Sequence, residues 1–306
     1  MTHQGWLKGT ARPWRPCWRR WCELLLVGDA HGHVNPVKGI GPSKLARRFK
    51  SSGGWFMAVS SLLSWSYRGL AKRVEDYVEV FKLNVEAVEE MRREGLACAA
   101  IIGVHPAELV RLVESGVSLE EAERLVKEAY DAAARMVKDG LAQGLGEVGR
   151  PHFPSPRAVV EACNRVLDHA LELAHDLDCP VHIHVERGGP RTVEDVARRA
   201  RAKGAAKALL HHAEPSAWAL ASSLGLAASI PARSRDLLEA LRGPRPLSFL
   251  VESDFLDDPR RPGAVVAPWS IASTFEGLIK RGALTAEEAW RVLVDNVARF
   301  YGLEPP

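Results

Sequence analysis

The chain has 306 residues, a length that suits one large barrel or two ordinary domains. Hydrophobic residues make up 46% of the chain and charged residues 26%, which is typical of a globular protein with a sizeable core. The net charge is only +3 and no run of about 18 uncharged apolar residues occurs, which argues against an extensive nucleic-acid surface and a membrane span.

The first 22 residues differ from the rest of the chain. They carry five basic residues and no acidic one, so the remainder has a small net negative charge. Four tryptophans stand among these charges, at Trp6, Trp14, Trp18 and Trp21. No apolar stretch there has signal-peptide length, so we expect a cytoplasmic protein with a poorly ordered arm or an unneeded upstream start. The alternative is an arm that contacts nucleic acid or another subunit.

The five cysteines are scattered and form no CxxC pair. Three of them, Cys98, Cys163 and Cys179, lie in apolar or helical segments and are predicted to be small core residues. An odd, scattered set of cysteines is typical of a reducing cytosol.

From residue 23 onward, short apolar runs alternate with longer helical patterns. Each run has a core-like stretch and is followed by Gly, Pro or polar residues, as a buried parallel strand would be. The eight runs cover residues 24–31, 54–61, 96–106, 141–149, 179–186, 207–215, 226–232 and 247–255.

Amphipathic stretches lie between these runs and predict helices, because their apolar residues recur at steps of three and four. The clearest stretches are residues 75–95, 118–140, 156–177, 192–204 and 285–302. Capping boxes open two of them, at Ser118 with Glu121 and at Thr285 with Glu288. Glycines stand where helices should end, at Gly95, Gly140, Gly204 and Gly302.

Eight strands that alternate with helices predict an α/β fold with a parallel sheet. Eight is also the number of strands that closes a (β/α)8 TIM barrel, so residues 23–306 are predicted to form one such domain. An open, doubly wound sheet is the alternative, which the absence of a GxGxxG pattern after the first run disfavours.

Ionisable side chains stand at the ends of six of the runs. They are Asp29, His31, His33, His105, Glu147, His182, His184, His211, His212, Glu252 and Asp254. In a barrel the C-terminal ends of all strands open at one mouth, so these side chains should meet there. His31 and His33 are two residues apart and should point the same way, with Asp29 one step deeper to hold an imidazole from behind.

Histidine and carboxylate ligands without a thiolate cluster suit Zn²⁺, Mn²⁺, Mg²⁺ or Fe²⁺. A set large enough for two divalent ions is His31, His33, Glu147, His184, His212 and Asp254. Water bound to such ions attacks a phosphorus or carbonyl centre near neutral pH, and Asp254 could accept its proton as a general base. Each residue alone has a simpler interpretation as a core or surface side chain. The joint placement of so many ionisable groups predicts the metal site.

Six stretches together resemble the TatD-type metal-dependent hydrolases of the amidohydrolase superfamily, and among them an archaeal-type branch of predicted TIM-barrel hydrolases. They are DAHGH, GVHPAE, GLGEVGRPH, PVHIHVE, LLHHAEP and VESDFLDDPRRPG. The resemblance runs from about Asp29 to Tyr301 and does not cover residues 1–22. It implies a (β/α)8 barrel with a two-metal site and hydrolytic activity. The best-known members of the family are deoxyribonucleases.

The resemblance also implies individual roles. The matched ligands are His31 and His33 on the first strand, Glu147 as the bridging carboxylate, His184, His212 and Asp254. Either histidine at 211–212 could be the ligand. We prefer His212 because the family places its ligand two residues before a polar–proline step, which leaves His211 on the opposite pleat or in place of a basic residue. His182 lies one step deeper than His184 and is expected behind a ligand rather than on the metal.

Other side chains at the same mouth are candidates for substrate contact or catalysis. Arg150 could neutralise a phosphate, or it could pair with Glu186 or Asp257. His152 could protonate a leaving group. His105 could contact substrate, or it could bond to the backbone of its own turn.

Three functions remain open from the residues alone. The first is a metal-dependent phosphodiesterase with a nucleic-acid or nucleotide substrate, which the loop arginines and the basic arm favour. The second is hydrolysis of a small amide, ester or lactone, which the nearly neutral body favours. The third is a metal-bound scaffold without turnover. We expect a hydrolase with divalent ions, acting first on phosphodiesters; the sequence defines no oligomeric state.

Overall fold

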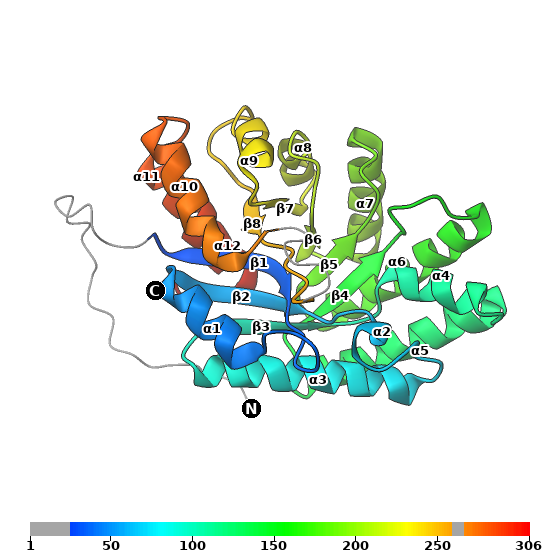
Figure 1. The fold of residues 1–306 in the computed structure, drawn as a ribbon. Helices are drawn as coiled ribbons and strands as arrows, with labels where there is room; N and C mark the ends of the chain where they lie inside the picture. Colours follow the sequence, from blue (N-terminus) through cyan, green and yellow to red (C-terminus); the bar gives the residue numbers. More distant parts are fainter. Residues whose placement is uncertain (1–24, 259–265) are drawn as a thin grey trace.

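The computed structural model describes residues 25–258 and 266–306 (Figure 1). Eight parallel strands form one sheet in sequence order. They are β1 (Val27–His33), β2 (Gly54–Ser60), β3 (Ala97–Ile102), β4 (Gly144–Gly149), β5 (Val181–His184), β6 (Ala208–Leu210), β7 (Ala227–Pro231) and β8 (Leu250–Glu252). Each of the eight predicted runs overlaps one of these strands, and β1 continues two residues beyond its run to His33, so the prediction of eight strands is confirmed.

The sheet closes into a barrel where the chain leaves β8. The backbone N–H of Asp254 donates to the carbonyl of His31 at 2.9 Å, and the N–H of His33 donates to the carbonyl of Phe255 at 2.7 Å. These bonds join the last strand region to the first strand. The predicted single (β/α)8 barrel is therefore confirmed, and the open doubly wound sheet is excluded.

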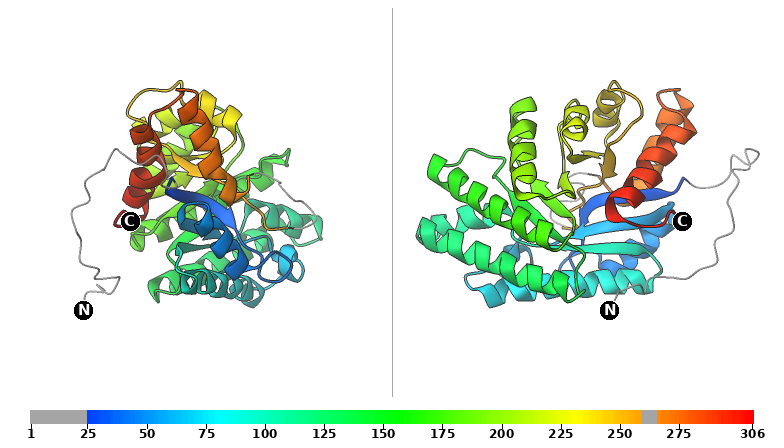
Figure 2. Two further views of the ribbon diagram at one scale, coloured as in Figure 1. Left: turned by 60° about the vertical axis from the view of Figure 1, so that its left-hand side comes forward. Right: turned by 180° about the vertical axis from the view of Figure 1, so that it is seen from behind.

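Helices surround the strands on the outside of the barrel (Figure 2). They are α1 (Pro42–Ser51), α2 (Ser64–Tyr67), α3 (Val74–Arg93), α4 (Pro106–Glu114), α5 (Leu119–Lys138), α6 (Arg157–Asp176), α7 (Pro190–Lys203), α8 (Trp218–Ser223), α9 (Ser234–Ala240), α10 (Ile271–Lys280), α11 (Ala286–Trp290) and α12 (Asn296–Tyr301). A short 3-10 turn, η1 (Pro268–Ser270), precedes α10, and a wider π-type turn, η2 (Arg291–Asp295), links α11 to α12.

Local signals in the sequence set several helix ends. The hydroxyl of Ser118 accepts the N–H of Glu121, and the hydroxyl of Thr285 accepts the N–H of Glu288, so both predicted capping boxes are confirmed. Gly204 and Gly302 end α7 and α12 with left-handed φ values of 74° and 66°.

One helix prediction was wrong in its continuity. Residues 285–302 form α11, η2 and α12 rather than a single α-helix. Within η2 the carbonyl of Leu293 accepts the indole N–H of Trp55 from β2 at 3.2 Å. The wider turn supplies this carbonyl to the barrel, a long-range contact that the apolar spacing does not encode.

The barrel interior is apolar at one end and polar at the other. Apolar residues of mixed size fill the first part, among them Ala30, Phe56, Ile101, Leu209 and Leu250. Toward the C-terminal ends of the strands, ionisable and hydroxyl side chains are completely buried instead, namely Asp29, His31, Ser60, His182, Ser229 and Glu252. Buried polar groups need partners, so a functional site is expected at this end of the barrel.

Two further predictions concern cysteines and the N-terminal arm. Cys98, Cys163 and Cys179 are buried free thiols in the core, as predicted. The arm over residues 1–22 and its tryptophans lie outside the described residues, as do residues 259–263 of the last resembling stretch. No helix within residues 25–258 and 266–306 has both the length and the apolar character to cross a membrane.

Candidate metal centre

Glu147 lies at the centre of a group of imidazoles at the mouth of the barrel. It belongs to β4 and is only 4% exposed. Its Oε1 atom is 3.3 Å from Nε2 of His31 and 3.2 Å from Nε2 of His33. Its Oε2 atom is 3.1 Å from Nδ1 of His184 and 2.8 Å from Nε2 of His211. One carboxylate thus presents one oxygen to each of two histidine pairs, as a carboxylate that bridges two ions would.

Asp254 and His212 border this cluster. Oδ1 of Asp254 is 3.7 Å from Nε2 of His33, and Nε2 of His212 is 3.2 Å from Nδ1 of His184. Four groups of three residues could each hold an ion, because the possible ligand atoms within each group lie within 4.8 Å of one another. They are His31–His33–Glu147, His31–His211–Asp254, His184–His211–His212 and His105–Glu147–His184.

The two histidines at 211–212 both face the cluster, so the expectation that His211 sits on the opposite pleat was wrong. Strand β6 ends at Leu210, and His212 has a left-handed φ of 39°, so strand alternation no longer applies there. His211 is buried and its Nε2 contacts both Glu147 and His184 at 2.8 Å. His212 has its Nε2 3.2 Å from Nδ1 of His184, and its ring lies against that of His211 with centroids 4.2 Å apart. The structure therefore offers both imidazoles as ligands.

The outward nitrogens of the ligand candidates have defined partners. Nδ1 of His33 is 3.0 Å from the carbonyl of Ser60, which can only accept, so Nδ1 carries a proton and, in the neutral ring, the lone pair lies on Nε2. Nδ1 of His31 is 2.8 Å from Nδ1 of His182, and Nε2 of His184 is 2.8 Å from Nδ1 of His152. A second imidazole thus stands behind two of the candidates, in the position where a metal-bound histidine usually meets a carboxylate, a carbonyl or a water.

Nε2 of His31 supplies the test of whether a metal fits. Among the described residues it is a buried nitrogen without a hydrogen-bond partner, although it points toward Oε1 of Glu147 at 3.3 Å. An unpaired buried nitrogen is costly, and a divalent ion would satisfy it. The donor set of imidazoles and carboxylates therefore fits the metal ions that the sequence predicts.

The electrostatics of the cluster also suit cations. Burial alone would raise the pKa of Glu147, but His211 and His31 hold it well below its ordinary value. Burial lowers the pKa of His212 to about 3, with His184 adding to the effect. For His33, burial would lower the pKa, but the Asp254 and Glu147 carboxylates raise it to about 10. Ionised carboxylates and neutral imidazoles are the protonation states that metals bind, and an ion near His33 would displace its proton.

The predicted role of Asp29 was wrong. Its Oδ1 accepts the N–H of Ser253 at 2.8 Å and the N–H of His31 at 3.3 Å, and it touches no imidazole ring among the described contacts. The register of β1 shifts between Asp29 and Gly32, so its side chains do not follow simple alternation. Asp29 instead ties β1 to the segment after β8. Burial raises the pKa of Asp29 to about 7.

Two residues were missed as supports of the site. Ser60 holds His33 through its carbonyl. Glu252 is fully buried; its Oε1 accepts the N–H of His212 at 2.7 Å, and the hydroxyl of Ser229 donates to its Oε2 at 2.5 Å. Its position two residues before Asp254 on the same strand end was the only sequence signal for Glu252. Burial and the neighbouring Asp254 raise the pKa of Glu252 well above its ordinary value.

Arg150 forms ion pairs with carboxylates, the second of its two interpretations. Its Nε and Nη2 atoms donate to the two oxygens of Glu186 at 2.9 Å, and its Nη1 donates to Asp195 at 2.5 Å. Asp257, the other expected partner, accepts backbone N–H groups of the β1–α1 loop instead. Because two carboxylates already neutralise the buried Arg150, neither it nor Glu186 faces the imidazole cluster as a free charge.

His105 bonds to the backbone of its own turn, which was one of its two interpretations. Its Nδ1 accepts the N–H of Ala107 at 3.0 Å and caps α4. The proton of a neutral ring therefore lies on Nε2, which is 3.2 Å from Nδ1 of His184 and 3.7 Å from Oε2 of Glu147. A nitrogen that carries a proton cannot bind a metal, so His105 presents a hydrogen-bond donor to the centre.

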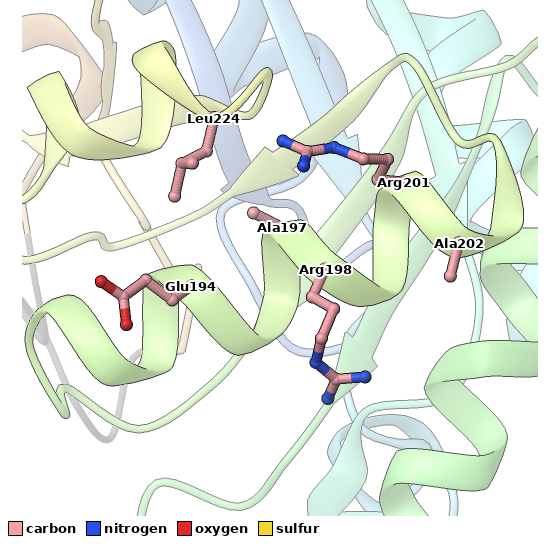
Figure 3. A pocket seen from close by; sticks show the side chains of 6 residues that line it. All are labelled: Glu194, Ala197, Arg198, Arg201, Ala202 and Leu224. Carbon is pink, nitrogen blue, oxygen red and sulfur yellow. The ribbon is translucent and has the colours of Figure 1, made fainter.

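Two hollows lie on the described surface. One of about 580 Å³ borders the cluster through His152. Its lining residues are Arg150, Pro151, His152, Phe153, Pro154, Val160, Asn164, Glu186, Arg191, Thr192 and Asp195. The other, of about 260 Å³, lies on α7 beside Leu224 and includes none of the candidate ligands (Figure 3). Of these two hollows, the first is the one that borders the cluster.

Comparison with known proteins agrees with this geometry. A family model described as TatD related DNase matches residues 28–302. An uncharacterized protein of Methanocaldococcus jannaschii is 29% identical over 290 residues, which cover 92% of this chain and 98% of that protein.

Solved structures share the fold. YJJV, a TatD homologue of Escherichia coli, superimposes with a TM-score of 0.62 at 18% identity, over 92% of this chain and 98% of that one. A triple mutant of organophosphorus hydrolase from Deinococcus radiodurans gives a TM-score of 0.60 at 16% identity, over 91% and 93% of the two chains. At such identities the likeness concerns the fold alone.

Proposed function

From the match over residues 28–302, the chain belongs to the TatD related DNase family, and we propose that it hydrolyses phosphodiesters with two divalent ions. The family is one of metal-dependent hydrolases, and the buried His and Glu groups of this chain could hold such ions. The observation that carries the proposal is the position of Glu147, with one oxygen facing each histidine pair.

The ligands divide between the two oxygens of Glu147. His31, His33 and Asp254 would hold the first ion with Oε1 of Glu147. His184, with His211 or His212, would hold the second ion with Oε2. Zn²⁺, Mn²⁺ and Mg²⁺ all suit this mixture of imidazole and carboxylate. Ions bound there would lower the pKa of a coordinated water and polarise the substrate.

Two side chains of the chain itself would move or hold protons. Burial opposes ionisation of Asp254, but His33 and His31 keep its pKa below the ordinary value, so it is an ionised acceptor for the proton of the attacking water. Nε2–H of His105 faces the same centre and would donate a hydrogen bond to a substrate oxygen.

Exposed cations around the mouth support a phosphodiester substrate. Lys38 follows β1, and Arg187 and Arg191 follow β5, and all three side chains are exposed. Arg191 also lines the 580 Å³ hollow next to His152. Such cations would attract the phosphates of a small nucleotide or of nucleic acid, the substrate classes that we propose as partners.

A small ester or lactone is the second candidate. Phe255, next to Asp254, packs on Trp269 with ring centroids 5.3 Å apart, which gives that side of the mouth an apolar wall. An apolar wall favours an uncharged substrate. A scaffold without turnover is disfavoured because the complete set of ligand candidates comes together.

A cytoplasmic location is also a proposal. Its support is that the three described cysteines, Cys98, Cys163 and Cys179, are free thiols, as in proteins of a reducing compartment.

Hydrolysis of bis(p-nitrophenyl) phosphate tests the function. Metal-stripped protein is supplied again with Mn²⁺, Zn²⁺ or Mg²⁺ and compared with Asp254→Asn and with Asp139→Asn, an exposed control at the end of α5. We expect metal-dependent turnover that falls at least about 100-fold in Asp254→Asn and is unchanged in the control. No turnover by wild-type protein that binds two ions would overturn the phosphodiester proposal, and turnover of p-nitrophenyl acetate or a lactone would replace it.

A further inference from the structure

We propose that Tyr301, the last residue of α12, is a positioning residue for the metal centre. Through His182 it fixes which ring nitrogen of His31 carries the proton, and so keeps Nε2 of His31 free to bind the first ion. The inference rests on the proposed metal centre, but it concerns a residue more than 40 positions beyond the last candidate ligand, Asp254.

The hydroxyl of Tyr301 defines the state of His182. Its oxygen is 2.7 Å from the carbonyl of Ala30 and 2.9 Å from Nε2 of His182. A carbonyl can only accept, so the hydroxyl proton goes to Ala30. The hydroxyl oxygen must then accept from His182, which places the His182 proton on Nε2.

The proton position of His182 determines the proton position of His31. A neutral imidazole carries one proton, so Nδ1 of His182 is an acceptor. It lies 2.8 Å from Nδ1 of His31, which therefore donates. The lone pair of His31 is then on Nε2, the atom that faces Glu147 and has no hydrogen-bond partner among the described residues.

Complete burial supports a neutral His182. It is 0% exposed, and a charged imidazole is costly to bury without a carboxylate partner. The hydroxyl of Ser60 also approaches Nδ1 of His31, at 3.3 Å. A hydroxyl can donate or accept, so Ser60 does not decide where the proton of His31 lies.

The contrast with His33 shows why a third residue is needed. Behind His33 stands a carbonyl, which fixes the proton by itself. Behind His31 stands an imidazole, which can accept or donate. If His182 carried its proton on Nδ1, it would donate to Nδ1 of His31 and leave the His31 proton on Nε2, where an ion should bind. Tyr301 excludes this arrangement, and its ring is held against Phe56 with centroids 4.7 Å apart.

Manganese binding to metal-stripped protein, followed by electron paramagnetic resonance, tests the role without any substrate. We expect Tyr301→Phe to bind one of the two ions at least about tenfold more weakly than wild type, as for other partners of metal-bound histidines. Tyr77→Phe is the matched control. It also removes a buried hydroxyl, which lies 3.4 Å from Glu108 and touches no histidine among the described contacts. Its affinity should equal that of wild type.

The manganese affinities of two His182 variants test the same role independently of Tyr301→Phe. The amide of His182→Gln offers an oxygen to His31 and an N–H to Tyr301, so most of the affinity should be kept. His182→Leu offers neither, so the affinity should fall as in Tyr301→Phe. The ¹⁵N signal of His31 Nε2 in the metal-free protein should be that of an unprotonated nitrogen in wild type and should move toward the protonated value in Tyr301→Phe.

The outcomes separate the two proposals. If wild type binds two manganese ions and folded Tyr301→Phe binds both equally well, the role of Tyr301 is overturned while the proposed function stands. If Tyr301→Phe does not fold, equal affinities of His182→Gln and His182→Leu would overturn the role in its place. If wild type binds no manganese, the metal centre fails, and the role of Tyr301 fails with it.

Discussion

The histidines at the mouth differ in the group that their outward ring nitrogen contacts. Nδ1 of His33 meets a carbonyl, Nδ1 of His31 meets an imidazole backed by a tyrosine, and Nε2 of His184 meets an exposed imidazole. The spacing of the first two histidines was readable in the sequence, because residues two apart on a strand share a face. Tyr301 was not readable, since its partner Ala30 lies 271 residues away and only the packing of α12 joins them.

The buried carboxyl group of Glu108 gives a prediction about how stability depends on pH. Glu108 on α4 accepts the N–H of Ser64 at 2.5 Å and its hydroxyl at 2.9 Å, and burial raises the pKa of Glu108 from 4.5 to about 7. Between these pH values the folded protein keeps a proton that the unfolded chain has lost, so its stability falls as pH rises. We expect wild type to lose at most about 3 kcal/mol relative to Glu108→Gln across this window.

Urea unfolding at several pH values between 4.5 and 8 measures this difference. Above pH 7 the free energies of unfolding of wild type and Glu108→Gln should change with pH in parallel. Glu120→Gln, at an exposed position of α5, is the control and should follow wild type at every pH. Parallel curves for wild type and Glu108→Gln between pH 4.5 and 7 would show that Glu108 is ionised in the folded protein.

At the scale of elements, the approach of β4 to β5 brings Glu147 to His184. Gly149 at the end of β4 has a φ of 144°, and a Cβ atom there would overlap the carbonyl of His184. That carbonyl also accepts the N–H of Arg150 at 2.8 Å. A side chain at position 149 would therefore push the two strands apart at the point where the two ligand candidates face each other.

Gly149→Ala should therefore damage both stability and metal binding. Gly116→Ala is a matched control, because Gly116 also has a positive φ, of 93°, but a Cβ atom added there would meet no described atom within 4 Å. We expect each change to cost about 1 kcal/mol or more for the backbone, with a further 1–3 kcal/mol, roughly, for the overlap in Gly149→Ala. Thermal unfolding and manganese titration measure both effects. Equal losses in the two variants would contradict a role for close β4–β5 packing.

The elements themselves were largely predictable. Apolar runs identified all eight strands, because the strands of a barrel are buried on both faces, and capping residues set the starts of α5 and α11. The errors lie where the backbone leaves its regular period. His212 with its positive φ defeated the pleat rule, the shifted register of β1 turned Asp29 away from the imidazoles, and η2 interrupted the last helix.

For the whole molecule, closure of the barrel makes the centre a meeting point of both ends of the chain. β1 contributes His31 and His33, the segment after β8 contributes Asp254, and backbone bonds between these two regions close the sheet. α12 then places the hydroxyl of Tyr301 between the carbonyl of Ala30 and Nε2 of His182. The gathering of these side chains at one mouth was predictable, because eight strand ends must share it. Which group contacts each of these side chains depends on the packing of the surrounding elements.

The most direct test of the centre is a crystal structure of the protein grown with Mn²⁺ and measured at the manganese absorption edge. We expect two anomalous peaks, one beside Oε1 of Glu147 near His31, His33 and Asp254, and one beside Oε2 near His184. No peak at Glu147, or a single ion bound through His184 with His31 and His33 left free, would contradict a two-metal centre bridged by this carboxylate.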